Sequence, residues 1–162
     1  MARIGFIGAS GLMGHGMARN LLAKGHHLTL AVHRNRERVA DLLAAGATEA
    51  ANAREVAAAS DLVFICVTGS PQVEASVTGA NGLLAGAHPG LMIVDCSTSE
   101  PDSTARLRAQ CGEVGVPFID APLSRTPVEA EAGRLNVMVG ADQSVFECLQ
   151  PVLACFAENI FH

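Results

Sequence analysis

The sequence predicts an α/β fold: a doubly wound, mainly parallel sheet in a single domain. Short apolar segments of strand length alternate along the chain with amphipathic segments of helical period. A near-continuous apolar run extends from Asp61 to Val67, as expected for a parallel strand covered on both faces. A glycine-rich turn separates the first strand from the first helix. Alternation at this spacing implies right-handed crossovers within one parallel sheet.

The individual elements follow from the period of the apolar residues and from their end signals. Met13, Met17 and Leu21 recur every four residues and form the apolar stripe of the first helix, which Gly25 ends. Asn35 and Asn52 are expected N-caps. In order, we expect strands over 3–8, 28–32, 61–67, 91–94 and 117–120, and helices that open near Met13, Asn35, Asn52, Ser70 and Pro101. The remainder is less regular, with strands at 137–139 and 160–161 around a helix that Pro151 kinks or restarts.

Length and charge set limits on function. A chain of 162 residues can bury about 70% of the surface that its unfolded form exposes, so it needs no disulfide or metal to hold a core. The net charge of −5 offers no basic field for nucleic acid. No apolar stretch in the sequence approaches the roughly 20 residues of a membrane span. We therefore expect neither a nucleic-acid nor a membrane partner.

The five cysteines indicate a reducing compartment. Their number is odd, no two form a Cys-x-x-Cys pair, and Cys66 and Cys96 lie in apolar runs. We interpret Cys66 and Cys96 as small buried side chains rather than as disulfide partners or metal ligands. We therefore expect a cytoplasmic protein.

The strongest chemical signal is the segment Gly8-Ala9-Ser10-Gly11-Leu12-Met13-Gly14, between the first strand and the first helix. A helix N-terminus carries unpaired N–H groups and partial positive charge, and glycines let a pyrophosphate approach it. The spacing Gly-x-x-Gly-x-x-Gly is one residue longer than the usual signature. The alternative is that these glycines only permit tight strand–helix packing. In its context the turn predicts a Rossmann-type dinucleotide-binding domain over residues 1–162.

The end of the second strand decides which dinucleotide is bound. An NAD-binding domain usually places Asp or Glu there to accept hydrogen bonds from the ribose 2′-hydroxyl. This chain instead reads His33-Arg34-Asn35-Arg36, and its first acid is Glu37. Arg34 can pair with a 2′-phosphate, which a carboxylate would repel. The sequence therefore favours NADP(H) over NAD(H), the alternative being that Arg34 and Arg36 only solvate a helix start.

Four segments in order resemble the N-terminal cofactor domain of the β-hydroxyacid dehydrogenase family, which includes 3-hydroxyisobutyrate dehydrogenases and is related to 6-phosphogluconate dehydrogenase. They are residues 5–21 with one inserted residue, Asp95-Cys96-Ser97-Thr98, residues 120–124, and residues 133–140. The resemblance covers essentially the whole chain. It implies hydride transfer between a nicotinamide and a small hydroxy acid or its semialdehyde.

The resemblance also implies site residues. Those for the cofactor are Gly8, Ala9, Ser10, Gly11, Leu12, Met13, His33, Arg34, Asn35, Val67, Thr68, Val73 and Thr98. Val67 and Thr68 replace the family's usual Leu-Pro, and Thr98 would approach the nicotinamide.

For the substrate, Ser124 would hold a carboxylate, and Arg125 and Thr126 stand where the family usually has Gly-Gly. Family members with Arg-Thr here include reductases of sulfonated short aldehydes. Arg125 can bind an anion bidentately, the alternative being a solvated loop charge. The implied substrate is a small anionic hydroxy acid or aldehyde.

The catalytic lysine of the family has no counterpart here. Lys24 is the only lysine and is expected at the far end of the first helix, while His15 and His162 are expected at the surface. The resemblance thus implies that the helical catalytic domain, which usually makes the homodimer, is absent from this chain, and no catalytic residue is assigned. Two functions stay open: the cofactor portion of an oxidoreductase, or a stand-alone NADP(H)-binding or redox-sensing module without turnover. A short-chain dehydrogenase is excluded because the sequence has no tyrosine.

Overall fold

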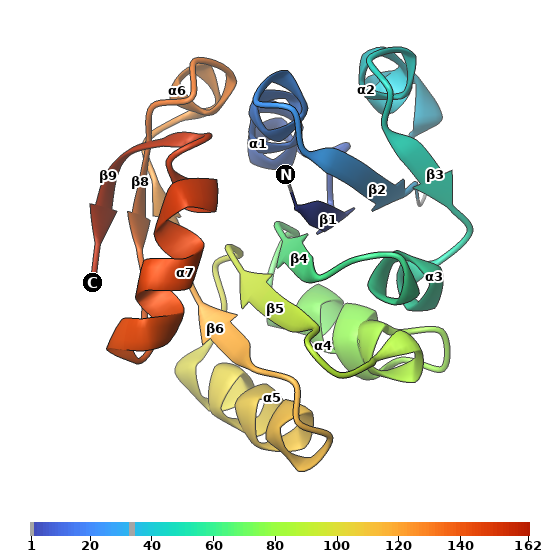
Figure 1. Ribbon diagram of the computed structural model, residues 1–162, viewed down its shortest axis with the longest axis vertical. Helices are drawn as coiled ribbons and strands as arrows, with labels where there is room; N and C mark the ends of the chain where they lie inside the picture. Colours follow the sequence, from blue (N-terminus) through green and yellow to red (C-terminus); the bar gives the residue numbers. More distant parts are fainter. Residues whose placement is uncertain (1, 33–34) are drawn as a thin grey trace.

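The computed structural model describes residues 2–32 and 35–162. Six parallel strands form a sheet in the order β3-β2-β1-β4-β5-β6 (Figure 1). Their bounds are β1 (Arg3–Ile7), β2 (His27–Ala31), β3 (Thr48–Ala50), β4 (Leu62–Ile65), β5 (Met92–Asp95) and β6 (Phe118–Asp120). Strand order reverses between β1 and β4, which makes this position the switch point of a doubly wound sheet. The predicted Rossmann-type α/β fold is confirmed.

Helices cover both faces of this sheet. They are α1 (Leu12–Ala23), the 3₁₀ turn η1 (Arg36–Val39), α2 (Ala40–Ala44), α3 (Ala53–Ala58), α4 (Ser70–Thr78), the 3₁₀ turn η2 (Leu83–Gly86) and α5 (Pro101–Glu113). In Figure 1, α1 and α2 lie on one face, and α3, α4 and α5 lie on the other. Two buried clusters correspond to these faces, one containing Met17 and Leu21 of α1 and the other Val73 and Val77 of α4. Burial on both faces explains why the strand sequences are apolar without alternation.

The last forty residues add a second, smaller sheet that the sequence only partly predicts. Its order is β7-β8-β9, with β7 antiparallel and β9 parallel to β8. Its elements are β7 (Leu123–Ser124), α6 (Pro127–Glu131), β8 (Leu135–Met138), α7 (Gln143–Leu153) and β9 (Ala157–Phe161). The register shifts by one residue opposite Leu135 and Asn136, which is a β-bulge in β9. The Gly140 N–H donates to the Asp120 carbonyl over 2.8 Å and joins this sheet to β6.

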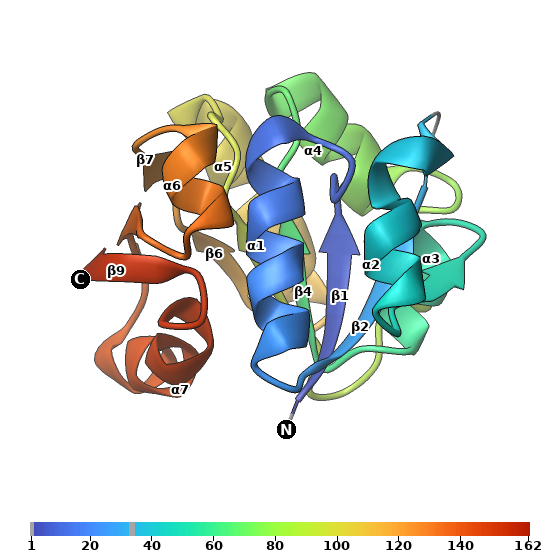
Figure 2. The ribbon, with the colours of Figure 1, turned by 90° about the horizontal axis from the view of Figure 1, so that it is seen from above.

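Helix α1 joins the two sheets. Figure 2 shows α6 lying beside α1. The contact is backbone to backbone, since a Cβ added to Gly16 would lie 2.4 Å from the Ala130 carbonyl carbon. The side-chain amide of Asn20 donates to the carbonyls of Gly16 (2.7 Å) and Ala130 (3.0 Å). The glycines of the first helix thus serve packing as well as the turn.

Several local expectations hold, and others need correction. Gly25 has φ +85° and ends α1, and Asn52 caps α3 by accepting from the Glu55 N–H at 3.1 Å. Asn35, however, makes no side-chain cap within the described part of the chain, because the segment after it begins as a 3₁₀ turn. Pro151 sits inside α7 without ending it.

The described residues include no helix that is long and apolar enough to cross a membrane.

Candidate functional site at the switch point

Three loops meet at the carboxyl ends of the central strands. They are the β1–α1 turn at Gly8–Gly11, the β4–α4 loop after Ile65, and the β5–α5 loop after Asp95. Parallel strands bring their carboxyl ends to one edge, and a crevice opens where the strand order reverses. Dinucleotides bind at this position in open α/β sheets. The candidate site is therefore built around the N-terminus of α1.

The glycine turn is shaped by close backbone contacts. Gly8 has φ +95°, and a Cβ on it would lie 2.0 Å from the Cys66 carbonyl oxygen. A Cβ on Gly14 would lie 2.3 Å from the Gly8 carbonyl oxygen, so α1 approaches the strand end through this glycine. Gly11 is the N-cap residue and has an ordinary extended backbone, φ −77° and ψ 163°. Gly8 and Gly14 are therefore required by the fold, whereas Gly11 leaves open the approach to the helix end.

The first turn of α1 is suited to an anion. Leu12, Met13 and Gly14 open the helix, and their N–H groups have no preceding helical turn to accept from them. The residues of this turn carry no carboxylate that would compete for the positive end of the helix dipole. Because a glycine caps the helix, no side-chain oxygen occupies the position where a capping residue would bind. A pyrophosphate fits this combination of open space and free donors.

Asp95 connects the other two loops. Its side chain is fully buried and accepts from the Ser97 N–H (2.9 Å) and the Ser99 hydroxyl (2.6 Å). The Ser97 hydroxyl in turn accepts from the Val67 N–H over 3.0 Å. These bonds fix the loop that carries the exposed Thr98 against the loop that carries Thr68. Asp95 belongs to one of the motifs that carry the family resemblance, but its role in holding both loops depends on the register of β4 and β5, which the sequence does not give.

A second carboxyl lies beside Asp95. Asp120 of β6 is paired with Asp95 in the sheet register. Partial burial raises the pKa of Asp120, the negative charge of Asp95 raises it further, and Arg108 lowers it in part. Burial also raises the pKa of the Cys66 thiol to about 12 and that of Cys96 well above its usual value. The raised pKa disfavours the thiolate, which is the reactive form of a cysteine.

The expected substrate residues lie on and after β7, at the start of the second sheet. The Ser124 hydroxyl is exposed and accepts from the side-chain amide of Asn136 at 3.1 Å. Arg125 has φ +84°, and its guanidinium donates to the Arg134 carbonyl (2.6 Å) and pairs with Glu158. Thr126 caps α6 in a capping box with Glu129. A cavity of about 400 Å³ is lined by Arg125, Thr126, Glu129, Arg134 and Glu158.

The expected cofactor residues fall into three groups. Gly8, Ala9, Ser10, Gly11, Leu12 and Met13 form the β1–α1 turn, while Val67, Thr68 and Thr98 lie on the two neighbouring loops. His33 and Arg34 lie outside the described residues, and the exposed Asn35 follows them. Val73 of α4 is fully buried against the sheet, and its contact with the cofactor stays a prediction.

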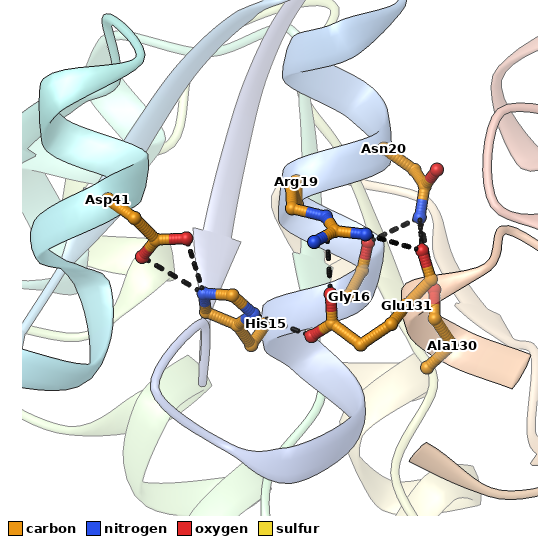
Figure 3. A network of polar contacts seen from close by, with 7 residues as sticks. All are labelled: His15, Gly16, Arg19, Asn20, Asp41, Ala130 and Glu131. Atoms are coloured by element: carbon orange, nitrogen blue, oxygen red, sulfur yellow. Dashed lines mark hydrogen bonds and ion pairs between the residues drawn. The ribbon is translucent and has the colours of Figure 1, made fainter. Parts of the chain in front are cut away.

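A polar network lies on the outer side of α1 (Figure 3). The two ring nitrogens of His15 contact Glu131 of α6 (Nδ1, 2.6 Å) and Asp41 of α2 (Nε2, 3.0 Å). Arg19 adds a bond to the Glu131 carbonyl at 2.9 Å. Two acceptors on opposite nitrogens require the doubly protonated ring. His15, expected at the surface, is only 21% exposed in its side chain and links three helices.

This arrangement makes stability depend on pH. Burial is the largest single influence and lowers the pKa of His15, but the hydrogen bonds and charges of Glu131 and Asp41 together outweigh it and raise the pKa. The stabilisation is therefore complete below the unfolded value of about 6.5 and disappears as pH rises through the higher folded pKa. Replacing His15 by Asn should lower the unfolding free energy by about 0.5–1 kcal/mol in mild acid and by less at alkaline pH.

Urea unfolding of both proteins across this range measures the effect. An equal loss for His15→Asn at every pH would contradict the charged form of the ring.

The fold and the glycine turn together define a dinucleotide-binding domain. The family model for the NAD binding domain of 6-phosphogluconate dehydrogenase matches residues 3–162. The chain belongs to this family.

Curated relatives cover the chain from end to end. A 2-(hydroxymethyl)glutarate dehydrogenase from Eubacterium barkeri is 41% identical over 99% of this chain and 52% of its own length. A 2-hydroxy-3-oxopropionate reductase from Escherichia coli is 41% identical over 98% of this chain and 53% of its own. An NAD-dependent L-serine dehydrogenase from Pseudomonas aeruginosa is 38% identical over 100% and 54%. The chain thus spans about half the length of the curated relatives it matches.

Solved structures agree with this assignment. A 3-hydroxyisobutyrate dehydrogenase from Mycobacterium tuberculosis with L-serine superposes with a TM-score of 0.90 at 29% identity, over 100% of this chain and 54% of its own. Psf3 in complex with NADP+ gives a TM-score of 0.89 at 31% identity, over 98% and 55%. The relatives thus include one named for NAD and one solved with NADP+.

Proposed function

We propose that this chain is the dinucleotide-binding portion of an oxidoreductase that transfers hydride between a nicotinamide and a small 3-hydroxy acid or its semialdehyde. The observation that carries the proposal is the glycine turn at the switch point, where Gly11 leaves the N-terminus of α1 open. Relatives named for hydroxy acids and their oxidised forms, 41% identical to this chain, support the substrate class.

In this proposal, different loops of the chain contact the cofactor and the substrate. The N–H groups of Leu12 and Met13 would bind the pyrophosphate at the helix end. Thr68 and Thr98, on loops tied together through Asp95 and Ser97, would border the ribose and the nicotinamide. Ser124 would donate a hydrogen bond to the substrate carboxylate. The nicotinamide, when bound, supplies the carbon that accepts or donates the hydride.

The preferred cofactor in this proposal is NADP(H). The sequence offers Arg34 and no acid directly after the second strand. A charge-assisted hydrogen bond contributes about 1.5–3 kcal/mol, so Arg34→Ala should weaken NADPH binding on the order of 10- to 150-fold. The affinity for NADH, which has no 2′-phosphate, should hardly change.

Titrating both cofactors into both proteins by calorimetry tests this preference. Arg38→Ala is a suitable control, since it removes one positive charge at an exposed position of η1. Equal losses of NADPH and NADH affinity in Arg34→Ala would contradict a 2′-phosphate contact.

The catalytic lysine that the family resemblance implies has no counterpart near the glycine turn. Lys24 is the only lysine and caps the far end of α1, about 18 Å from the glycine turn by the rise of a twelve-residue helix. General acid–base help is worth roughly 10²–10⁴-fold. We therefore propose that a further helical domain supplies the acid–base group. Without one, the chain acts as an NADP(H)-binding module.

The expected result is that the 162-residue chain binds NADPH but does not oxidise it with small semialdehydes, sulfonated ones included. The absorbance of NADPH measures turnover. Because the chain has no tryptophan, the fluorescence of the bound nicotinamide can be followed without a tryptophan signal and measures binding. Saturable turnover by the chain alone that disappears in Ser124→Ala would show that another residue serves as the base.

The remaining parts of the proposal concern location and partners. We propose a cytoplasmic protein, supported by five free cysteines, of which Cys96 is buried and Cys66 is partly buried. The small anionic substrate is its expected partner, and a second copy of the chain would assemble with it as a homo-oligomer.

A further inference from the structure

A row of three polar side chains crosses the second sheet. Ser124 of β7 pairs with Asn136 of β8, and Asn136 pairs with Asn159 of β9. Their neighbours Leu135 and Val137 are fully buried, so the row lies on the opposite, outward face of the sheet. Ser124 and Asn159 are exposed and Asn136 is partly buried. The row therefore ends at the hydroxyl proposed to meet the substrate.

The hydrogen bonds in this row all point the same way. The Asn159 side-chain N–H donates to Asn136 Oδ1 over 3.0 Å. The Asn136 side-chain N–H then donates to Ser124 Oγ over 3.1 Å. A serine hydroxyl has one hydrogen and two acceptor lone pairs. Because Ser124 Oγ already accepts from Asn136, its hydrogen remains directed away from the row and available to a ligand.

The bulge in β9 places Asn159 opposite Asn136. The register passes from Leu135 opposite Ala157 to Asn136 opposite Asn159, so Glu158 is the extra residue. Consecutive residues of a regular strand point to opposite faces, whereas Glu158 and Asn159 are both exposed. Glu158 pairs with Arg125, and Asn159 bonds to Asn136. One bulge thus supports both Ser124 and Arg125, in keeping with the use of bulges to aim side chains near sites.

We infer that Asn136 and Asn159 are positioning residues that hold the Ser124 hydroxyl as a hydrogen-bond donor, which selects ligands bearing an acceptor-only group such as a carboxylate. The inference deepens the proposed function and rests on it for the ligand. Asn136 fixes the direction because its amide oxygen is already engaged by Asn159. A carboxylate accepts and cannot donate, so it matches a hydroxyl held in this way.

The direction of the row can be measured without any ligand. In ¹³C,¹⁵N-labelled protein, Ser124→Ala removes the acceptor of the Asn136 amide. The Asn136 side-chain N–H protons should then shift upfield, while its Cγ resonance stays nearly unchanged. If Ser124 instead donated to Asn136, the Cγ resonance would move and the N–H protons would not, and the inference would be overturned.

Asn159→Asp should reverse the row. Its carboxylate can only accept, so the Asn136 amide should turn to donate to it and offer its oxygen to Ser124. In that background Ser124→Ala should move the Asn136 Cγ resonance instead of its N–H protons. Asn159→Leu is the matched neutral control of similar shape, in which neither direction is imposed. An Asn136 amide that responds to neither substitution would contradict a positioning role.

The effect on binding uses sodium D-glycerate as the probe and the NADP+-loaded chain. The affinity of the chain for glycerate should fall about 2- to 10-fold in Asn159→Asp, the range of one neutral hydrogen bond. In Asn159→Leu it should fall by less. In a double-mutant cycle with Ser124→Ala, the part of the Asn159→Asp effect that acts through Ser124 should vanish. Full additivity would mean that the added charge alone repels the acid, and would overturn the positioning role. A wild-type chain that binds no glycerate would contradict the proposed function instead, and the amide shifts would still decide the direction of the row.

Discussion

Gly11→Val is expected to abolish binding of NADPH while the domain stays folded. Gly11 has φ −77° and ψ 163°, which any residue adopts. A Cβ on Gly11 would lie 3.1 Å from the Gly8 carbonyl oxygen and 3.9 Å from the Cys66 carbonyl oxygen. The valine methyl groups would instead occupy the open space before the helix end, where the pyrophosphate must approach. The affinity should fall more than about 100-fold, which corresponds to over ~2.7 kcal/mol.

Calorimetric titration and circular dichroism together test this result. Gly112→Val is the matched control, since a Cβ on this helical glycine of α5 meets nothing within 4 Å. It should bind NADPH as the wild type does. If Gly11→Val also bound normally, the cofactor would have to lie away from the glycine turn.

Gly8→Ala should damage the fold itself rather than the site alone. The new Cβ would lie 2.0 Å from the Cys66 carbonyl oxygen, at the point where β1 and β4 end side by side. The left-handed backbone, φ +95°, adds about 1–2 kcal/mol. We expect a total loss above about 4 kcal/mol, which places the substitution among the exceptional ones.

Gly25→Ala separates the two causes. Gly25 has a similar φ of +85°, but a Cβ there meets nothing within 4 Å. It should therefore show only the backbone cost of about 1–2 kcal/mol, or roughly 2–8 °C in Tm for a chain of this length. Thermal unfolding of both variants gives the comparison. Equal shifts for Gly8→Ala and Gly25→Ala would show that the strand ends separate easily.

The parallel sheet and the glycine turn could be predicted because they depend on local patterns. The apolar run before Cys66 predicts a buried strand, and the glycines after Ile7 predict a tight turn. Each prediction needs only a few consecutive residues. The edge strand β3 (Thr48–Ala50) was not predicted, since its three residues are mostly exposed and lack an apolar pattern. Strand β9 was predicted only at its end, because its bulge interrupts the alternation on which strand prediction relies.

The side-chain partners could not be predicted, because they join residues far apart in the sequence. His15 meets Glu131 across 116 positions, and Asn136 meets Asn159 across 23. Arg125 was expected to be free for an anion, whereas the structure engages its guanidinium with Glu158 and a carbonyl. A substrate contact by Arg125 stays a prediction. A loop residue reveals its type in the sequence, but its partners only once the second sheet is assembled.

The backbone contact between Gly16 and Ala130 has a consequence for engineering. Helix α1 begins at the cofactor turn, and α6 begins at Thr126, directly after the loop proposed to hold the substrate. With a Cβ position 2.4 Å from the neighbouring backbone, the two helices cannot slide or be respaced independently. Residues 123–131 therefore cannot be exchanged for the same segment of a relative while α1 stays unchanged. A chimera that imports this segment from a relative must import the matching face of α1 as well, so the proposed substrate loop and the glycine turn are inherited together.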